Sequence, residues 1–115
     1  MKHHVWSEIE EEVLSPTISR KMIAGQKGMV ARIFLKKGAV VPEHHHENEQ
    51  FTIILSGALE FIIEGKSIVV RPGEVLEIPS NVPHSAVALE DTDDMDIFVP
   101  PRQDWLEGRD DYLRE

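Results

Sequence analysis

From Gly28 onward, the chain alternates short apolar runs with turn signals at intervals of about ten residues. Gly, Pro, Asn and Asp fill the turn segments, because these residues adopt the backbone angles that turns require. The apolar runs are MVARIFL, FTIIL, ALEFII, SIVV, VLEI, HSAVAL and MDIFV, and the turn segments are KKGAVVPE, SG, EGK, RPGE, PSNVP and EDTDD. The pattern predicts an all-β sandwich or barrel.

Two of these runs meet at Glu64 and Gly65, and the stretch IIEGKSI predicts a β-hairpin through that pair. Other strands, such as FTIIL, are apolar on both faces. One face fills the interior of a small barrel, so another sheet or another subunit has to cover the outer face. A homodimer is the most economical cover, and we expect one.

The two ends lack this pattern. We expect SEIEEEVL to form a helical turn or a charged lead-in strand, and RQDWLEGRDDYLRE to form a short helix or an ordered tail. Four side chains of the ends are interpreted as packing residues: Trp6, Trp105, Tyr112 and Leu113. A chain of 115 residues suits a single domain. We predict a barrel core at about 28–100, a lead-in over 1–27 and a tail over 101–115.

Composition argues against some classes of function. The net charge of −9 repels phosphate backbones and anionic lipids, which argues against binding to nucleic acid or to a membrane surface. An anionic small molecule would need a local cation in its pocket, either a metal or a buried arginine. The charged N-terminus does not resemble a signal peptide, and no apolar run reaches the roughly 18 residues of a membrane span. We therefore expect a cytoplasmic protein.

The histidines indicate a metal site. Since strand side chains alternate, His44 and His46 share a face and His45 points away. Gln50 has the same parity, but six extended residues would span roughly 20 Å. The intervening ENE must therefore bend and place Gln50 at the start of the next antiparallel strand. His84, after the turn PSNVP, is a fourth candidate.

The absence of cysteine leaves only nitrogen and oxygen ligands. Imidazole nitrogens suit a divalent transition metal such as Ni, Zn, Mn or Fe, and we expect one ion per chain with a position open for substrate. For the triplet alone, a solvated surface cluster is an equal alternative, and Gln50 either ligates or orients a water. His3 and His4 lack such context and are interpreted as surface residues.

The spacing resembles that of a single-domain cupin. Gly38, His44, His46, Gln50 and Gly57 follow the first cupin motif, and a second set follows most of the second motif: Gly73, Pro79, Asn81 and His84. The resemblance implies a jelly-roll barrel. The sequence departs from the family pattern at three positions: Gln50 stands where Glu is usual, Asn81 where Gly is usual, and Ala88 where Asn is common.

The segment DIFVPPRQDWL is similar to the closing segment of KdgF-type cupins, which open the ring of 4,5-unsaturated uronates. That resemblance implies the ligand set His44, His46, Gln50 and His84. It also implies an acid/base Asp96, a pocket-lining Phe98 and a carboxylate-binding Arg102. The neutral amide of Gln50 leaves a bound metal more positive, which favours non-redox polarisation.

From the strand pattern alone, Asp96 faces either the barrel interior or solvent, and the pattern favours solvent. Arg102 either clamps a substrate carboxylate through a bidentate contact or forms a surface salt bridge with Asp104 or Glu107. The sequence therefore predicts a metal-dependent cupin that acts on a small sugar acid. Two other functions stay open: an Fe(II) dioxygenase and a non-catalytic sugar-binding or sensor protein.

Overall fold

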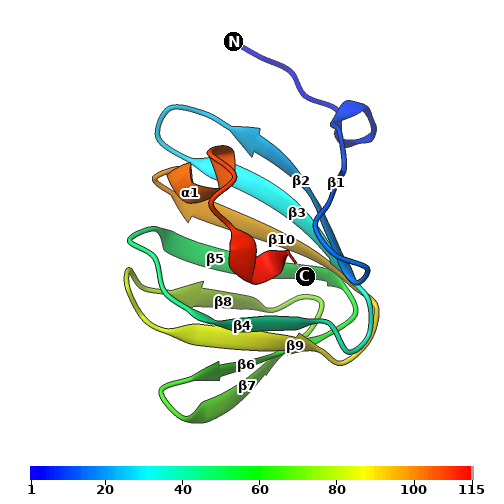
Figure 1. The fold of residues 1–115 in the computed structure, drawn as a ribbon, viewed down its shortest axis with the longest axis vertical. Helices are drawn as coiled ribbons and strands as arrows, with labels where there is room; N and C mark the ends of the chain where they lie inside the picture. The colour runs from blue at the N-terminus through cyan, green and yellow to red at the C-terminus, as the bar shows by residue number, and fades with distance from the viewer. Residues whose placement is uncertain (115) are drawn as a thin grey trace.

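The computed structural model describes residues 1–114, and it is built almost entirely of β-strands, as the sequence pattern predicts. Figure 1 shows two antiparallel sheets that face each other. The strands are β1 (Glu12–Val13), β2 (Ile18–Ala24), β3 (Met29–Leu35), β4 (Val40–His44), β5 (Glu49–Ser56), β6 (Leu59–Ile63), β7 (Lys66–Val70), β8 (Val75–Ile78), β9 (His84–Ala88) and β10 (Thr92–Val99). The helical turns are η1 (Trp6–Glu8), α1 (Gln103–Leu106) and η2 (Asp111–Leu113).

The larger sheet has the strand order β1-β2-β3-β10-β5-β8, and the smaller has β4-β9-β6-β7. From β3 to β6 the chain crosses between the sheets at every step, and from β7 to β10 it does so again. This alternation produces a jelly-roll barrel, the fold of cupins. The all-β prediction is confirmed.

Two strands lie where the sequence pattern predicted none. β2 pairs with β3 along its whole length and so extends the larger sheet into the expected lead-in. Its alternation is obscured because Arg20 occupies an inward position and is fully buried. β4 begins in the second half of KKGAVVPE and extends to His44, so the interpretation of that whole segment as a turn is wrong. Pro42 falls within the register irregularity of the β4–β9 pair, where a missing backbone donor is tolerated.

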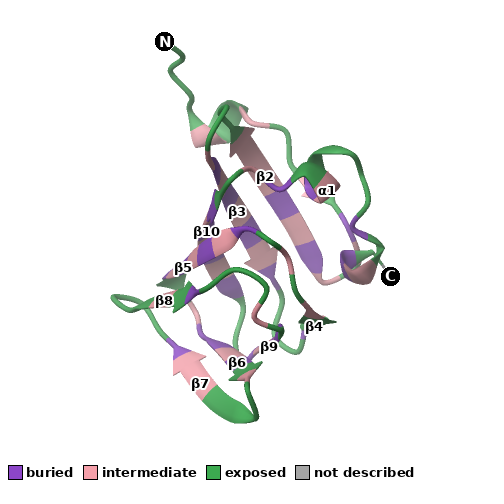
Figure 2. Cartoon of the chain, turned by 90° about the vertical axis from the view of Figure 1, so that its left-hand side faces the viewer, coloured by how far each residue is buried: buried purple, intermediate pink, exposed green. Residues whose placement is uncertain are grey.

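The core lies between the sheets, and β3 illustrates how it forms. Along β3, buried and half-buried residues alternate strictly, because alternate side chains face the interior. Figure 2 shows the same alternation as stripes on β2 and β3. Trp105 and Leu113 of the C-terminal segment also belong to the core, which confirms them as packing residues.

In two turns, the backbone angles explain which residues are present. Glu64 and Gly65 have φ values of 53° and 75°, as a type I′ hairpin turn requires, and the predicted β6–β7 hairpin is confirmed. Gly57 has φ +87°, and a Cβ there would lie 2.4 Å from the carbonyl oxygen of Asp91. Only glycine fits that position.

At the N-terminus, η1 overlaps the start of the segment SEIEEEVL and β1 lies within it, so the segment contains both a helical turn and a short strand. His3 and His4 are exposed, as expected. Within residues 1–114, no helix combines the length and the apolar character needed to cross a membrane.

Candidate metal centre and active site

Three histidines meet inside one end of the barrel. His44 ends β4, His84 begins β9, and the two are direct cross-strand partners. His46 follows two residues after β4, and the three side chains offer nitrogen atoms that all lie within 4.8 Å of one another. His45 is exposed, as the strand parity predicted. Within the triplet, a solvated surface position holds for His45 and is wrong for His44 and His46.

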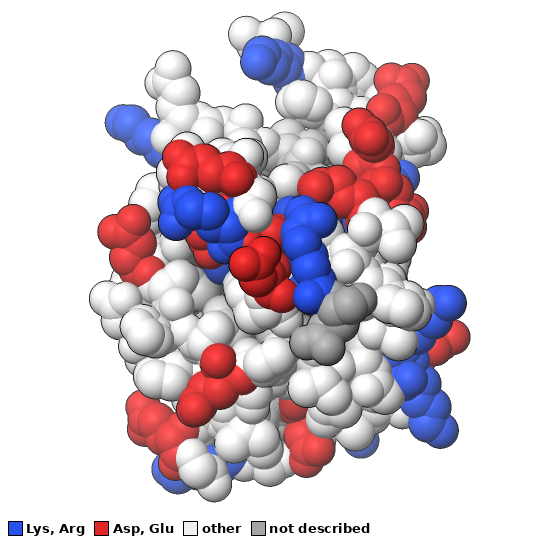
Figure 3. Space-filling view, viewed as in Figure 1, with Lys and Arg blue, Asp and Glu red and all other residues white. Residues whose placement is uncertain are grey.

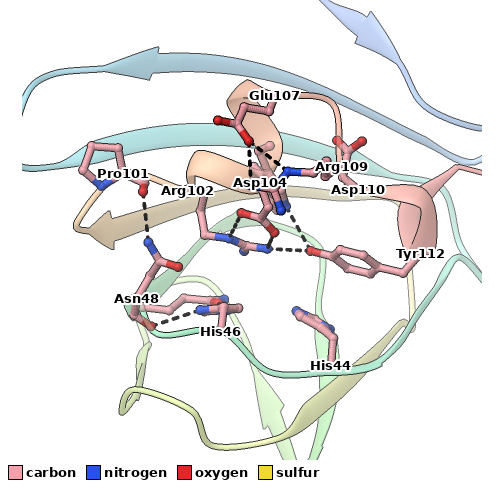
Figure 4. Close-up of polar contacts among 12 residues, drawn as sticks. His44, His46, Asn48, Pro101, Arg102, Asp104, Glu107, Arg109, Asp110 and Tyr112 are labelled. Atoms are coloured by element: carbon pink, nitrogen blue, oxygen red, sulfur yellow. Dashed lines mark hydrogen bonds and ion pairs between the residues drawn. The ribbon is translucent and has the colours of Figure 1, made fainter.

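A backbone carbonyl fixes the tautomer of each ring. Nδ1 lies 2.8 Å from the Pro42 carbonyl in His44, 3.0 Å from the Asn48 carbonyl in His46 and 2.8 Å from the Val82 carbonyl in His84. A carbonyl oxygen only accepts, so Nδ1 carries the hydrogen and Nε2 is left with a lone pair. Figure 4 shows the contact from His46 to Asn48.

Burial keeps these imidazoles neutral. It lowers the pKa of His44 to about 3 and that of His46 to about 4, and it also lowers the pKa of His84. The positive charge of Arg102 acts in the same direction on all three. Neutral imidazoles with free Nε2 lone pairs are the form in which histidine binds metals.

Gln50 joins the group from the facing sheet. It is buried near the start of β5, and its Oε1 lies 3.1 Å from Nε2 of His46. The ENE segment bends as expected, but it carries the chain across to the other sheet and not to an adjacent strand of the same sheet. Two acceptor atoms at this distance repel unless a cation lies beside them.

The residues present therefore fit a metal ion. Nε2 of His84 is buried with no hydrogen-bond partner among the described residues, although buried polar atoms normally have one. Nε2 of His46 faces an oxygen that cannot donate to it. A divalent transition metal bound by the three nitrogens and the amide oxygen would satisfy both.

Asp96 and Phe98 face the interior. They are 4% and 1% exposed, whereas the alternate residues Met95 and Ile97 are half-buried on the outer face. The solvent-facing orientation that the strand pattern favoured for Asp96 is therefore wrong. Desolvation raises the pKa of Asp96 to about 6, although a hydrogen bond donated by Thr52 opposes the shift.

Sequence reasoning missed Asp94, which lies on the same inward face of β10 and is 3% exposed. Its side chain lies beside that of Asp96, so each carboxyl makes ionisation of the other less favourable. Burial, followed by the charge of Asp96, raises the pKa of Asp94 well above its usual value. The alternation Asp94, Asp96, Phe98 was a usable signal once the inward face was known.

Arg102 is 1% exposed and is already paired. Its Nε and Nη2 donate to the two carboxylate oxygens of Asp104 at 2.9 and 2.8 Å, and Nη2 also donates to the Tyr112 hydroxyl at 2.9 Å (Figure 4). The salt bridge with Asp104 exists, but Arg102 itself is buried. Nη1 has no hydrogen-bond partner in the part of the chain that the structure describes, so it is the atom left to meet an anion.

Tyr112 does more than pack. Its ring stacks on His44 at a centroid distance of 4.5 Å, and its hydroxyl accepts hydrogen bonds from Arg102 and Trp105. The C-terminal segment lies across the barrel opening in Figure 1, and the cavity left at the site measures about 50 Å³. The sequence predicts only a packing role for Tyr112, and no periodic pattern in the tail indicates this second role.

Two asparagines hold the histidine loop. The backbone N–H of Asn81 donates to the His46 carbonyl at 2.8 Å, and Asn81 adopts φ 63°, which explains why glycine is usual at this cupin position. The Asn48 amide donates to the carbonyls of Pro100 and Pro101 at 2.6 and 3.1 Å. The loop is thereby tied to the start of the C-terminal segment.

A second hollow, of about 530 Å³, lies at the opposite end of β5 and β10, near Ser56 and Thr92. It is open to solvent and remote from the histidines. The smaller and better enclosed cavity is the one lined by His44, Gln50 and His84, together with Phe98 and Arg102.

The two-sheet barrel, the motif spacing and the three convergent histidines define a cupin. Residues 31–100 match the family model described as Cupin domain, and the chain belongs to this family. The match covers more than half of the described chain and includes both motifs.

Proteins that align with nearly the whole chain make the resemblance more specific. The chain is 29% identical over 108 residues to "Pectin degradation protein KdgF" of Dickeya dadantii (strain 3937), covering 91% of this chain and 98% of the relative. It is 30% identical to KdgF from Halomonas sp., whose solved structure superposes with a TM-score of 0.85 over 91% of this chain and 98% of the other. An RmlC-like cupin from Shewanella frigidimarina NCIMB 400 is 25% identical, with a TM-score of 0.84 over 91% and 96% of the two chains. The predicted resemblance to KdgF-type cupins is confirmed.

Proposed function

We propose that this cupin is a metal-dependent isomerase that opens the ring of a 4,5-unsaturated uronate. The proposed metal ligands are His44, His46, Gln50 and His84, with one divalent transition metal per chain. The observation that carries the proposal is the buried Asp96, which a single threonine connects to Gln50 beside the histidines. The similarity to KdgF proteins over nearly the whole chain supports the same class of substrate.

The reaction requires few groups. When bound, the metal supplies a Lewis-acid cation that polarises an oxygen of the sugar. The C1–O5 bond breaks as the C1 hydroxyl loses its proton and becomes a carbonyl, and O5 keeps the electron pair of that bond. The resulting enolate becomes a ketone as C4 gains a proton. One proton is lost and one is gained, so the reaction is an isomerisation.

Asp96 is the residue assigned to transfer protons in this reaction. Its raised pKa of about 6 lies near neutrality, where a carboxyl group both accepts and returns a proton efficiently. Burial raises the pKa of the neighbouring Asp94 well above its usual value, so Asp94 favours its protonated form. Phe98 walls the pocket next to His46, at a ring-centroid distance of 5.7 Å.

Arg102 is assigned to the substrate carboxylate. Because Asp104 occupies Nε and Nη2, the anion would meet Nη1 through a single contact, in place of the bidentate clamp that we expected. This buried guanidinium supplies positive charge within an acidic chain. Ligand pockets usually measure about 300–1,000 Å³, whereas the cavity at the site measures about 50 Å³. The C-terminal segment, which carries Tyr112, would therefore move to admit a sugar.

The test is a spectroscopic assay with 4,5-unsaturated galacturonate or mannuronate. Metal-loaded protein should speed the loss of the ring double bond's ultraviolet absorbance beyond the spontaneous rate. Asp96→Asn should lower kcat by about 100-fold or more, because it removes the proton carrier and keeps the shape. Asp93→Asn is the matched control, since Asp93 points outward on the same strand and pairs with Arg32.

No acceleration with either sugar would contradict the ring-opening assignment. Tight binding of the sugar without turnover would instead support the sugar-binding alternative. Oxygen consumption that depends on Fe(II) would support the dioxygenase.

A further inference from the structure

One fully buried hydroxyl connects the two halves of the site. Thr52 is 0% exposed, and its side chain faces the barrel interior from the middle of β5. Its Oγ1 lies 2.9 Å from Nε2 of Gln50 and 2.8 Å from Oδ1 of Asp96. The candidate metal ligand and the candidate acid/base group therefore share a single oxygen atom.

The hydrogen on that oxygen gives the chain of contacts a direction. A hydroxyl has one hydrogen, and a carboxylate only accepts, so Thr52 donates to Asp96. Its lone pair then accepts from Gln50, which must present its NH₂ group to Thr52. The amide oxygen of Gln50 is thereby turned the other way, towards Nε2 of His46 at 3.1 Å.

Asp94 favours the same arrangement of hydrogen bonds. Asp94 and Asp96 are buried side by side on the inner face of β10, and two such carboxyls do not both ionise. The ionised form of Asp96 is favoured by the hydroxyl of Thr52 and by the charge of Arg102. The proton therefore resides on Asp94, whose partners on the neighbouring strands are the apolar Ile33 and Ile54. Asp93, the other acid beside it, carries its charge on the outer face.

We propose that Thr52 is a positioning residue that holds the Gln50 amide oxygen towards the metal and holds Asp96 ready as a carboxylate. The ligand role of Gln50 in this proposal rests on the proposed function. The proposal also explains the amide at position 50. A glutamate there would compete with Asp96 for the one hydrogen of Thr52, so an amide and a carboxylate are the pair that a single hydroxyl can serve.

The first experiment measures metal binding without any sugar. Purified metal-free protein is titrated with Zn²⁺ alone, by competition with a chromogenic chelator, for wild type, Thr52→Val and Thr52→Ser. Valine keeps the shape but frees the amide to rotate, so Kd for Zn²⁺ should rise by about 10-fold. Serine keeps the hydroxyl and should restore the wild-type affinity.

Thr92→Val is the matched control. Thr92 is also a buried threonine, but its hydroxyl bonds the backbone of Ala58 near the opposite end of the sheet. This variant should lose stability and keep its affinity for Zn²⁺. An unchanged Kd in folded Thr52→Val would overturn the proposal, as would an equal loss in Thr92→Val.

The second experiment uses nuclear magnetic resonance on metal-free protein and needs no variant for its first readout. In wild type, the side-chain NH₂ protons of Gln50 should exchange slowly with solvent and show contacts to Thr52. Contacts to the His46 ring in their place would mean that the amide is reversed, and would overturn the proposal. In Thr52→Val, the carboxyl of Asp96 should titrate at higher pH than in wild type, because it loses a donor.

An unchanged Asp96 titration would overturn the link between the two groups. Neither experiment depends on turnover of a uronate. Failure of the ring-opening reaction and failure of the Thr52 assignment are therefore separate results.

Discussion

Each histidine of the site donates from Nδ1 to a backbone carbonyl two residues away, which leaves Nε2 free to bind a metal. We expect about one metal ion per chain after loading and dialysis, measured by mass spectrometry of the metal. His84→Ala should lose it, because one of three nitrogen ligands disappears. His45→Ala is the matched control, since His45 is exposed beside the same site. Full retention in His84→Ala would exclude this metal centre.

Asp96 should make the stability of the protein depend on pH. Its pKa is raised to about 6, so between the ordinary value and about 6 the folded state binds more protons than the unfolded state. Stability from this group is therefore present at low pH and is lost as the pH rises through about 6. Wild type, relative to Asp96→Asn, should lose about 1–3 kcal/mol of unfolding free energy between pH 4 and pH 7.

Chemical denaturation of metal-free protein at the two pH values measures this difference. Comparing the two proteins at each pH separates Asp96 from the histidines, whose lowered pKa values act in the opposite direction and are common to both. A wild type that gains on the variant as the pH rises would contradict the assignment.

The C-terminal segment is the element that closes the site, and buried charges hold it in place. Arg20 of β2 pairs with Asp110, and both side chains are fully buried. The Trp105 ring lies near two guanidinium groups, 4.7 Å from that of Arg20 and 4.4 Å from that of Arg102. Figure 3 shows acidic and basic side chains side by side over this segment. The strand missed by the sequence pattern, β2, is therefore the one that anchors the tail.

Asp110→Ala should destabilise the fold by about 3 kcal/mol, because it leaves Arg20 charged and buried with only the partly exposed Glu12 as partner. Unfolding in urea measures the loss. Asp111→Ala is the control, since Asp111 is the exposed neighbour and should change stability by less than about 0.5 kcal/mol. Equal effects in both variants would show that the buried pair does not anchor the segment.

For the whole molecule, the outer face of the larger sheet carries an apolar stripe. Ile53 of β5 lies between Met95 of β10 and Val75 of β8, and Val75 is 61% exposed. A second copy of the chain could cover this stripe, in keeping with the homodimer that we expected from strands that are apolar on both faces.

Sedimentation equilibrium at micromolar concentration should show a dimer, and Ile53→Lys should give a monomer, because a charge would be buried at the interface. Ile62→Lys is the matched control on the outer face of the smaller sheet, and it should stay dimeric. A wild type that remains monomeric at every concentration would contradict the homodimer.

Local signals in the sequence predicted much of the fold and part of the site. Strand periodicity predicted β3 and β5 to β10, and the Glu64–Gly65 turn predicted its hairpin, because these depend on neighbouring residues. The group formed by His44, His46, Gln50 and His84 was predictable for a related reason. Short segments of fixed spacing place His44, His46 and Gln50, and the second motif of the cupin resemblance supplied His84.

Tertiary structure alone decided the rest. Strand alternation sorts Asp94, Asp96 and Phe98 onto one face, but only the packing of β10 between β3 and β5 makes that face the inner one. Nothing in the sequence indicated that Arg20 is buried, and for Arg102 a pocket position and a surface salt bridge were both open. The two arginines are buried because Asp110 and Asp104 from the folded-back tail offset the cost of desolvation. The burial of Arg20 and the inward orientation of the β10 side chains depend on partners remote in the chain, so no local pattern contained them.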